Sequence, residues 1–389
     1  MKSEWKQVQL SDIADLTVGF VGTMAQHYVD DGIVFLRSTN IEPFKMNLDD
    51  VKYISQEFNQ KIKKSQLNFG DVVIVRTGKP GACAVIPQIE NSWNCSDLVI
   101  IRPNQEKILP LYLAAYINLA YGVINAHLVG AVQQHFNVGS AKKLVIDLPP
   151  ISTQKQIVGI IQAINDKIEL NQRINDNLER QASALIEKYF EDTDTLTILS
   201  DIMRFENGFA FQSKTYLPTG QYRIVTIKNV QDGRINPQDA ACINDLPAKM
   251  KPGCVLHIGD VLLSLTGNVG RVGIVCEDNL LLNQRVAKIV PNENALLPFL
   301  YFVFRHPSIK IQIESIAKGT AQLNLSPVET LGLGIPYQRE SAHQLAGRLF
   351  PLYCSIIQNS QENLVLATTR DALLPKLMSG ELDVSNLQL

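Results

Sequence analysis

The sequence is poor in the residues that hold metals. Its 389 residues include six cysteines and six histidines, and no two cysteines have the Cys-x-x-Cys spacing of a zinc site. We therefore expect buried, reduced thiols and no metal. Long apolar runs are also missing, since none approaches the roughly 20 residues that span a bilayer. Residues 1–5 lack the basic-then-apolar pattern of a signal peptide, so we expect a soluble, cytoplasmic protein without a membrane partner.

The familiar motifs of catalysis and nucleotide binding are absent as well. We find no GxxxxGK[ST] phosphate loop, no GxGxxG, no HExxH and no GxSxG. The stretch Thr-Gly-Lys-Pro-Gly at 77–81 lacks the upstream glycine of a phosphate loop, so it predicts a hairpin turn. The Asp-Leu-Pro-Pro stretch at 147–150 lacks the Asn and the aromatic residue of an adenine methyltransferase motif. We therefore expect a binding protein that is not an enzyme and holds no cofactor.

An excess of positive charge is the third thing missing. The formal net charge is -2, whereas proteins that grip nucleic acid alone usually carry a surplus of cations. The charge argues mildly against nucleic acid, but it leaves room for local basic patches and for partners that supply part of the grip.

What the chain does have is a twofold internal repeat with an offset of about 188 residues. The stretch Leu-Ser-Asp-Ile at 10–13 returns at 199–202, and the Thr-Gly-x-x-Gly of 77–81 returns at 266–270. The residues between such matches differ widely. A scaffold repeated with different contents suggests two related sites of different specificity in a pseudo-symmetric molecule.

Each repeat begins with a mixed segment, at 1–150 and at 191–335. Apolar runs at 72–75 and 261–265 follow Gly-Asp and precede the Thr-Gly-x-x-Gly turn, so they predict a strand, a turn and a return strand. Short helices are expected at 109–120 and 297–305, each with a proline in its first turn. The pattern predicts two α+β domains with largely antiparallel sheets.

Each repeat closes with a long heptad series, expected as helices at 151–190 and 336–375. The first series is Ile157, Ile161, Ile164, Ile168, Asn171, Asn175, Leu178, Ala182, Leu185 and Tyr189. The second is Leu345, Leu349, Leu352, Ile356, Asn359, Asn363, Leu366, Arg370 and Leu373. Near-twofold symmetry favours an antiparallel two-helix coiled coil, and 30 helical residues would extend about 45 Å.

Two asparagines stand at matched positions of each series, Asn171 with Asn175 and Asn359 with Asn363. A polar residue in an apolar seam penalises registers that leave its amide unpaired, so we expect these four to fix the register. Pro351 predicts a kink or an irregular first turn in the second helix. By the repeat arithmetic, the tail 376–389 should return toward the first domain.

These features together resemble the specificity subunits of Type I restriction–modification systems, and the resemblance covers the whole chain. It rests on the duplicated Gly-Asp strand with its Thr-Gly-x-x-Gly turn, on the Leu-Pro-Pro-Ile-Ser-Thr-Gln-Lys-Gln-Ile stretch at 148–157, and on the ending Leu-Leu-Pro-Lys-Leu-Met-Ser-Gly-Glu-Leu at 373–382. The second helix departs from the pattern at Pro351 and at 335–340, where the double proline is missing.

The resemblance implies two target-recognition domains, each of which reads one half of a bipartite double-stranded DNA site, with the helix pair setting the unread spacer. It also implies docking of two modification subunits, which methylate adenine, and of restriction subunits, which translocate and cleave DNA with ATP. Two alternatives stay open: a targeting subunit whose partner fuses methyltransferase and nuclease, and a coiled-coil scaffold that binds only proteins.

Base reading requires Arg, Lys, Asn or Gln side chains near base edges, and three pairs of matched loops offer such residues. The candidate DNA contacts are Arg37, Thr39, Asn40, Arg76, Lys79, Gln133, Gln134, His135, Lys228, Asn229, Asn268, Arg271, Lys318, Gln322 and Asn324. The competing interpretation for each loop is an ordinary exposed polar surface.

Overall fold

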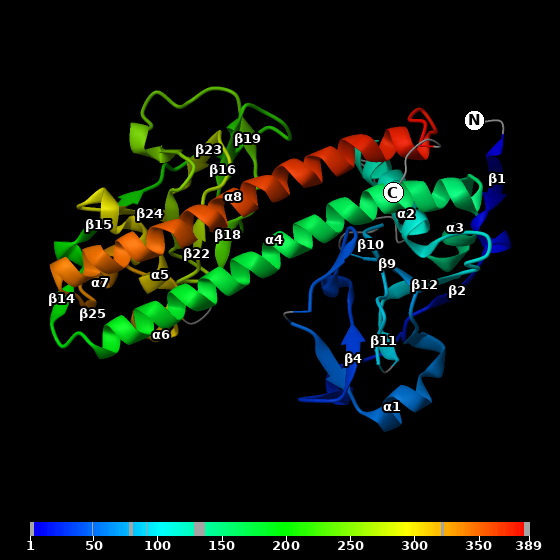
Figure 1. Ribbon diagram of the computed structural model, residues 1–389, viewed down its shortest axis with the longest axis horizontal. Coiled ribbons are helices and arrows are strands. Elements are labelled where there is room, and N and C mark those ends of the chain that lie inside the picture. Colours follow the sequence, from blue (N-terminus) through cyan, green and yellow to red (C-terminus); the bar gives the residue numbers. More distant parts are fainter. Residues whose placement is uncertain are drawn as a thin grey trace. The chain divides into compact units, whose positions relative to one another are not determined.

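The computed structural model describes residues 4–48, 50–77, 81–90, 92–127, 137–319 and 323–384, with the backbone alone for 121–127 (Figure 1). The chain divides into two compact units. Unit 1 consists of Met1–Asn165 and Ala367–Leu389, and unit 2 of Asp166–Leu366. Both boundaries fall inside long helices, so each unit contains one part of α4 (Ile151–Glu191) and one part of α8 (Arg339–Met378).

Unit 1 contains two main sheets, with strand orders β10-β9-β12-β2 and β3-β7-β4-β11-β8. The first comprises β2 (Ala14–Val18), β9 (Val72–Val75), β10 (Cys83–Val85) and β12 (Leu98–Pro103). The second comprises β3 (Tyr28–Val29), β4 (Ile33–Leu36), β7 (Lys52–Ile54), β8 (Gln66–Leu67) and β11 (Trp93–Cys95). Shorter pairs join β1 (Lys6–Gln9) to β13 (Val145–Leu148) and β5 (Ile41–Glu42) to β6 (Lys45–Met46). The α-helices of this unit are α1 (Gln56–Lys61), α2 (Pro110–His127) and α3 (Val138–Lys142), besides its parts of α4 and α8.

Unit 2 repeats this plan. Its sheets have the orders β15-β24-β21-β22-β18-β17 and β19-β16-β23-β20. The first comprises β15 (Met203–Asn207), β17 (Val230–Gln231), β18 (Gly233–Ile235), β21 (Val261–Ser264), β22 (Val272–Ile274) and β24 (Val286–Pro291). The second comprises β16 (Tyr222–Val225), β19 (Cys242–Ile243), β20 (Val255–Leu256) and β23 (Leu280–Leu282), while β14 (Leu196–Ile198) pairs with β25 (Gly334–Pro336). Its helices α5 (Leu297–Arg305), α6 (Pro307–Ile316) and α7 (Pro327–Leu331) accompany its parts of α4 and α8.

The central strands are apolar on both faces because each face has its own core. In β9, Val72 and Ile74 belong to the core that includes α2 and the helix residue Ile157, whereas Val73 and Val75 belong to a core shared with the second sheet. Successive strand residues point to opposite faces, so a continuous apolar run is what a strand between two layers requires. The α+β class and the strand–turn–strand prediction are confirmed.

Two details of the sequence-based prediction need adjustment. Although most strand pairs are antiparallel, β4 with β11, β16 with β23 and β18 with β22 are parallel. The helix expected at 109–120 extends from Pro110 to His127, while α5 has the predicted bounds 297–305.

The second long helix differs from its predicted range. It begins at Arg339 rather than 336, because Gly334–Pro336 pairs with β14, and it ends at Met378 rather than 375. The helix is unbroken through Pro351, so the irregular first turn is not found. A proline ring crowds the carbonyl four residues earlier, which here belongs to Gly347.

The C-terminal tail packs into unit 1. Leu377, Met378 and Val384 are each at most 4% exposed and belong to the core that also contains Leu10. A Cβ built on Gly380 would lie 3.4 Å from the Trp5 ring. The two ends of the sequence therefore contribute to one core.

Four of the thiols are buried, but Cys276 and Cys354 are half-buried, which corrects the expectation that all six are buried. Burial raises the pKa of Cys276 to about 11, so this thiol stays protonated near neutral pH. Within the described parts of the chain, no helix is long and apolar enough to cross a membrane.

Candidate nucleic-acid interface

The turn after the central strand is closed by the same backbone hydrogen bond in both units. The amide of Gly81 donates to the carbonyl of Val75 at 3.1 Å, and the amide of Gly270 donates to that of Ser264 at 3.1 Å. Both glycines have left-handed φ angles, of 94° and 79°, which other residues adopt only at a cost. The last glycine of the Thr-Gly-x-x-Gly repeat therefore closes the turn in the same way in both units, while residues 78–80 lie outside the described residues.

In unit 2 this turn lies beside another of the predicted loops. The amide of Gly267 donates to the carbonyl of Leu323 at 2.9 Å, and Lys318 and Asn324 exchange backbone hydrogen bonds of 2.8 and 2.9 Å. Thr266 and Asn324 also form a bridge. Two loops that are some 50 residues apart in the sequence thus form one surface.

The side chains on this surface are polar, and two are basic. Asn268 is exposed, and in the amide orientation that satisfies both groups its oxygen accepts from the Arg271 guanidinium at 3.2 Å. Lys318 is exposed and forms an ion pair with Glu329, and Asn324 is exposed beside it. These groups are of the kind that donate to base edges and phosphates.

Asn40 and Asn229, two of the predicted contacts, instead hold their loops together. Asn40 is 2% exposed; its side-chain oxygen accepts from the Arg37 amide at 2.9 Å and its nitrogen donates to the Asn47 carbonyl at 2.9 Å. Asn229 is 5% exposed and makes the matching bonds to Thr226 and Asn236 at 2.9 and 3.0 Å. Because their amides are occupied inside the protein, we exclude both from the proposed DNA contacts.

The neighbours of these asparagines are more accessible. Thr39 and Lys228 are exposed at the matched positions. Arg37 is half-buried and donates to the Asp50 carboxylate at 3.0 Å, and this hydrogen bond, with Lys52, lowers the pKa of Asp50.

The matching surface of unit 1 centres on a residue that we did not predict, Asp97. The Arg76 guanidinium lies 3.6 Å from its carboxylate, and the hydroxyls of Ser38 and Thr77 donate to the same carboxylate. Two of the predicted loops therefore meet here. Lys79, Gln133, Gln134, His135 and Gln322 lie outside the described residues.

The seam asparagines contact one another inside unit 2, where α4 and α8 lie side by side (Figure 1). The Asn171 amide nitrogen donates to Asn363 at 2.9 Å and to the Glu362 carboxylate at 2.7 Å. The Asn359 nitrogen donates to Asn175 at 2.8 Å. Residue numbers thus rise along α4 from Asn171 to Asn175 while those of their partners on α8 fall from 363 to 359, so the paired segments are antiparallel. Hydrogen bonds from Asn171 and then Lys167 lower the pKa of Glu362, which keeps this acceptor ionised.

The register role of these asparagines remains a prediction that a double-mutant cycle can test. Asn171 is fully buried, and Asn363→Leu removes the side-chain oxygen that accepts from the Asn171 nitrogen. The substitution should therefore lower the free energy of unfolding by about 1–3 kcal/mol. Asn171→Leu with Asn363→Leu should restore most of that loss, because two apolar side chains need no partners. The measurement is denaturant unfolding of the four variants, and additive effects would contradict a coupled pair.

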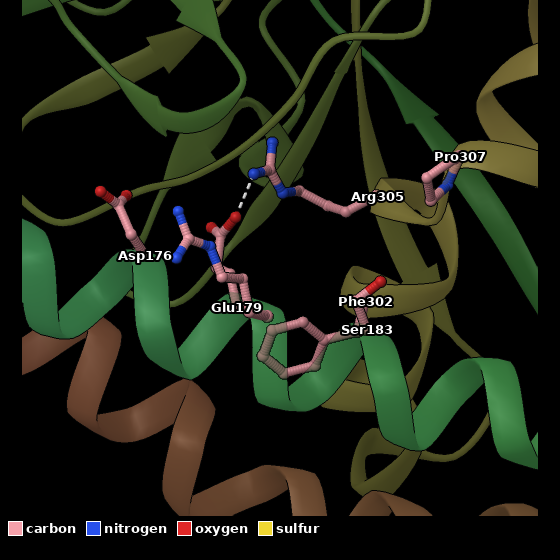
Figure 2. A pocket seen from close by; sticks show the side chains of 7 residues that line it. Asp176, Glu179, Ser183, Phe302, Arg305 and Pro307 are labelled. Carbon is pink, nitrogen blue, oxygen red and sulfur yellow. Dashed lines mark hydrogen bonds and ion pairs between the residues drawn. The ribbon is translucent and has the colours of Figure 1, made fainter.

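A pocket of about 300 Å³ lies where α5 meets α4 in unit 2. It is lined by Asp176, Glu179, Arg180, Ser183, Phe302, Arg305 and Pro307. Figure 2 shows the carboxylate of Glu179 turned toward the Arg305 guanidinium, with which it forms an ion pair.

The Tyr301 hydroxyl donates to the other oxygen of Glu179 at 2.8 Å. Burial raises the pKa of Tyr301 well above its ordinary value, so the hydroxyl keeps its proton and remains a donor. Because the half-buried charges of Glu179 and Arg305 pair with each other, this part of the pocket joins α5 to α4.

Comparison with known proteins gives the same family for both repeats. The model of the Type I restriction modification DNA specificity domain matches residues 2–180 and 196–366. The HindI specificity subunit of the Type I restriction enzyme from Haemophilus influenzae is 22% identical over 467 aligned positions, covering 98% of this chain and 100% of that protein. The MjaVIII specificity subunit from Methanocaldococcus jannaschii is 21% identical over 398 positions, covering 95% and 88%.

Among solved structures, a Type I restriction-modification S subunit from M. genitalium aligns with a TM-score of 0.48 at 15% identity, covering 96% of each chain. The family model itself spans most of the chain and matches both copies of the repeat. The chain therefore belongs to the family of Type I restriction modification DNA specificity domain proteins.

Proposed function

We propose that each unit reads one half of a bipartite, asymmetric double-stranded DNA site and that the paired helices set the unread spacer. The observation that carries this proposal is the matched turn. The same backbone hydrogen bond closes it in both units, whereas its surroundings present Arg76 in unit 1 and Asn268 with Arg271 in unit 2. One scaffold with two sets of donors suits a protein that reads two different half-sites.

We further propose that the chain acts with two adenine-methylating modification subunits and with ATP-dependent restriction subunits. The near-neutral charge of the chain supports shared binding. With a net charge of -2, the chain brings no surplus of cations to the phosphates, and the affinity of an assembly depends on all the phosphates that its subunits neutralise.

The test is selection from a random double-stranded DNA library by the full chain together with the modification partners of its own system. We expect enrichment of two short motifs separated by a fixed number of unread base pairs. Enrichment of no sequence in the presence of the partners would overturn the proposal and favour a protein-binding scaffold.

Arg271→Ala gives a sharper prediction within this assay. If Arg271 donates to a base, its loss should weaken binding to the selected site by about 1–3 kcal/mol, or roughly 5- to 150-fold, and relax one position of one half-site. The matched control is Arg173→Ala, which removes the same charge from an exposed pair with Glu169 on α4. Equal effects of the two substitutions would show that Arg271 contributes only charge.

A further inference from the structure

The carboxylate of Asp97 stands where three segments of unit 1 converge. One oxygen accepts from the Ser38 hydroxyl at 3.3 Å and also from Thr77, and the other lies 3.6 Å from the Arg76 guanidinium. Ser38 comes from the loop before β5, Arg76 and Thr77 are the two residues directly after β9, and Asp97 itself lies between β11 and β12. The site is therefore assembled by the fold rather than by local sequence.

Asp97 is held in an unusual backbone conformation but is not closed off from solvent. Its φ angle is 54°, in the left-handed region that few residues other than glycine enter, although Asp and Asn tolerate it best. Its side chain is 44% exposed. A carboxylate has about four acceptor positions, so the three neighbours leave it capacity to accept a further hydrogen bond from outside.

The sheet register identifies the equivalent segment of unit 2. Asp97 directly precedes Leu98, which pairs with the last residue of β9, Val75. In unit 2, Val286 pairs with the last residue of β21, Ser264, and the residue directly before Val286 is Arg285. On the other side, the Ser96 amide donates to the Leu36 carbonyl as the Asn283 amide donates to that of Val225. The single residue Asp97 therefore stands where unit 2 has two residues, Gln284 and Arg285, and the two matched segments carry opposite charges.

Arg285 lies next to the polar surface of unit 2 that carries Arg271 and Lys318. Its carbonyl accepts from the amide of Leu265 at 3.1 Å, one residue before the Thr-Gly-x-x-Gly turn that carries Asn268 and Arg271. Its side chain is exposed, and the described part of the chain offers its guanidinium no hydrogen-bond or ion-pair partner. A free guanidinium beside two further donors is suited to acceptor-rich ligand groups.

We propose that this matched segment, through Asp97 in unit 1 and Arg285 in unit 2, determines specificity in both units. Asp97 accepts from the exocyclic amino group of a cytosine in one half-site, and Arg285 donates to O6 and N7 of a guanine in the other. The two base edges present opposite hydrogen-bonding groups in the major groove, so side chains of opposite charge discriminate between them. The inference rests on the proposed DNA-reading function and adds the residue and the base class for each half.

The test uses Asp97→Asn and Arg285→Gln in the full chain with its modification partners, by the same library selection. Asparagine also tolerates the left-handed region, so Asp97→Asn should fold like the parent. We expect Asp97→Asn to lower the preference for cytosine at one position of one half-site by at least about fivefold, and Arg285→Gln to lower a guanine preference in the other half by as much. Asp31→Asn, an exposed carboxylate change in the same unit, should alter neither half.

The outcomes separate the two proposals. If the parent selects a bipartite site and either variant keeps the parental base preferences, the specificity role of that residue is wrong. If Asp97→Asn instead weakened binding to all DNA sequences equally, Asp97 would only position Arg76. That result would also overturn the inference. If the parent itself selects no site, the DNA-reading function fails first, and this inference falls with it.

Discussion

A chain that ends at Pro375 is expected to lose the fold of unit 1, because this unit contains residues from both ends of the sequence. Unit 2 should remain folded. The truncation removes Leu377, Met378 and Val384, whose side chains are 2–4% exposed in the core of unit 1. Burial of each contributes about 1.5–3 kcal/mol. Their combined loss therefore approaches the roughly 5–15 kcal/mol that stabilises a typical domain.

Limited proteolysis followed by mass spectrometry measures this effect, since it reports which segment becomes accessible. We expect rapid cleavage throughout 4–165 and a protected fragment that contains unit 2. Leu377→Ala alone should cost about 2–5 kcal/mol, whereas Lys376→Ala, at an exposed neighbouring position, should cost little. A truncated chain whose first 165 residues resist the protease as the parent does would show that the tail is dispensable.

The architecture could be predicted because its signals are periodic and appear twice. The heptad seam predicts burial at fixed spacing, and Ile157 and Ile161 are indeed 1% exposed. The Gly-Asp strands with their Thr-Gly-x-x-Gly turns are local patterns, each with its partner strand a few residues away. The parallel pair β4–β11 could not be predicted in this way, because it joins 33–36 to 93–95 and depends on the packing of the whole unit.

The repeat contained a signal for the candidate site that our first interpretation missed. Asn40 and Asn229 are identical at matched positions, and the structure shows them in matching hydrogen bonds inside their loops. Identity between the copies thus marks the shared backbone. Residues that read different half-sites should differ between the copies, as Asp97 differs from the Gln284–Arg285 pair that stands in its place in unit 2.

The contact between the turn of a small hairpin and a long helix has also diverged between the units. At the tip of one hairpin, Gly233 has a φ of 84°, and a Cβ there would lie 2.9 Å from the Glu179 carboxylate. The matched residue of unit 1 is Phe44, with a φ of 64°, and the Arg370 guanidinium lies 4.7 Å from the centre of its ring. The same turn therefore meets a long helix through an ionic cluster in one unit and through a cation–π contact in the other.

Glu179→Ala is expected to destabilise unit 2 by about 2–4 kcal/mol, because it leaves buried partners unpaired. The fully buried Tyr301 would lose the acceptor of its hydroxyl, and Arg305, whose side chain is 20% exposed, would lose its closest carboxylate. Asp232 remains 3.7 Å from Arg305, which keeps the expected loss below that of a wholly unpaired buried charge. Denaturant unfolding measures the change in free energy.

Two companion variants assign the loss to the cluster. Glu169→Ala removes a carboxylate from the same helix, but its i,i+4 pair with Arg173 is exposed on both sides and should contribute only about 0.3–0.5 kcal/mol. Glu179→Gln keeps an acceptor for Tyr301 while removing the charge that faces Arg305, so its loss should fall between the other two. If Glu179→Ala cost no more than Glu169→Ala, the contact between α4 and α5 would depend on apolar packing alone. The ionic cluster would then not be what holds α5 to α4.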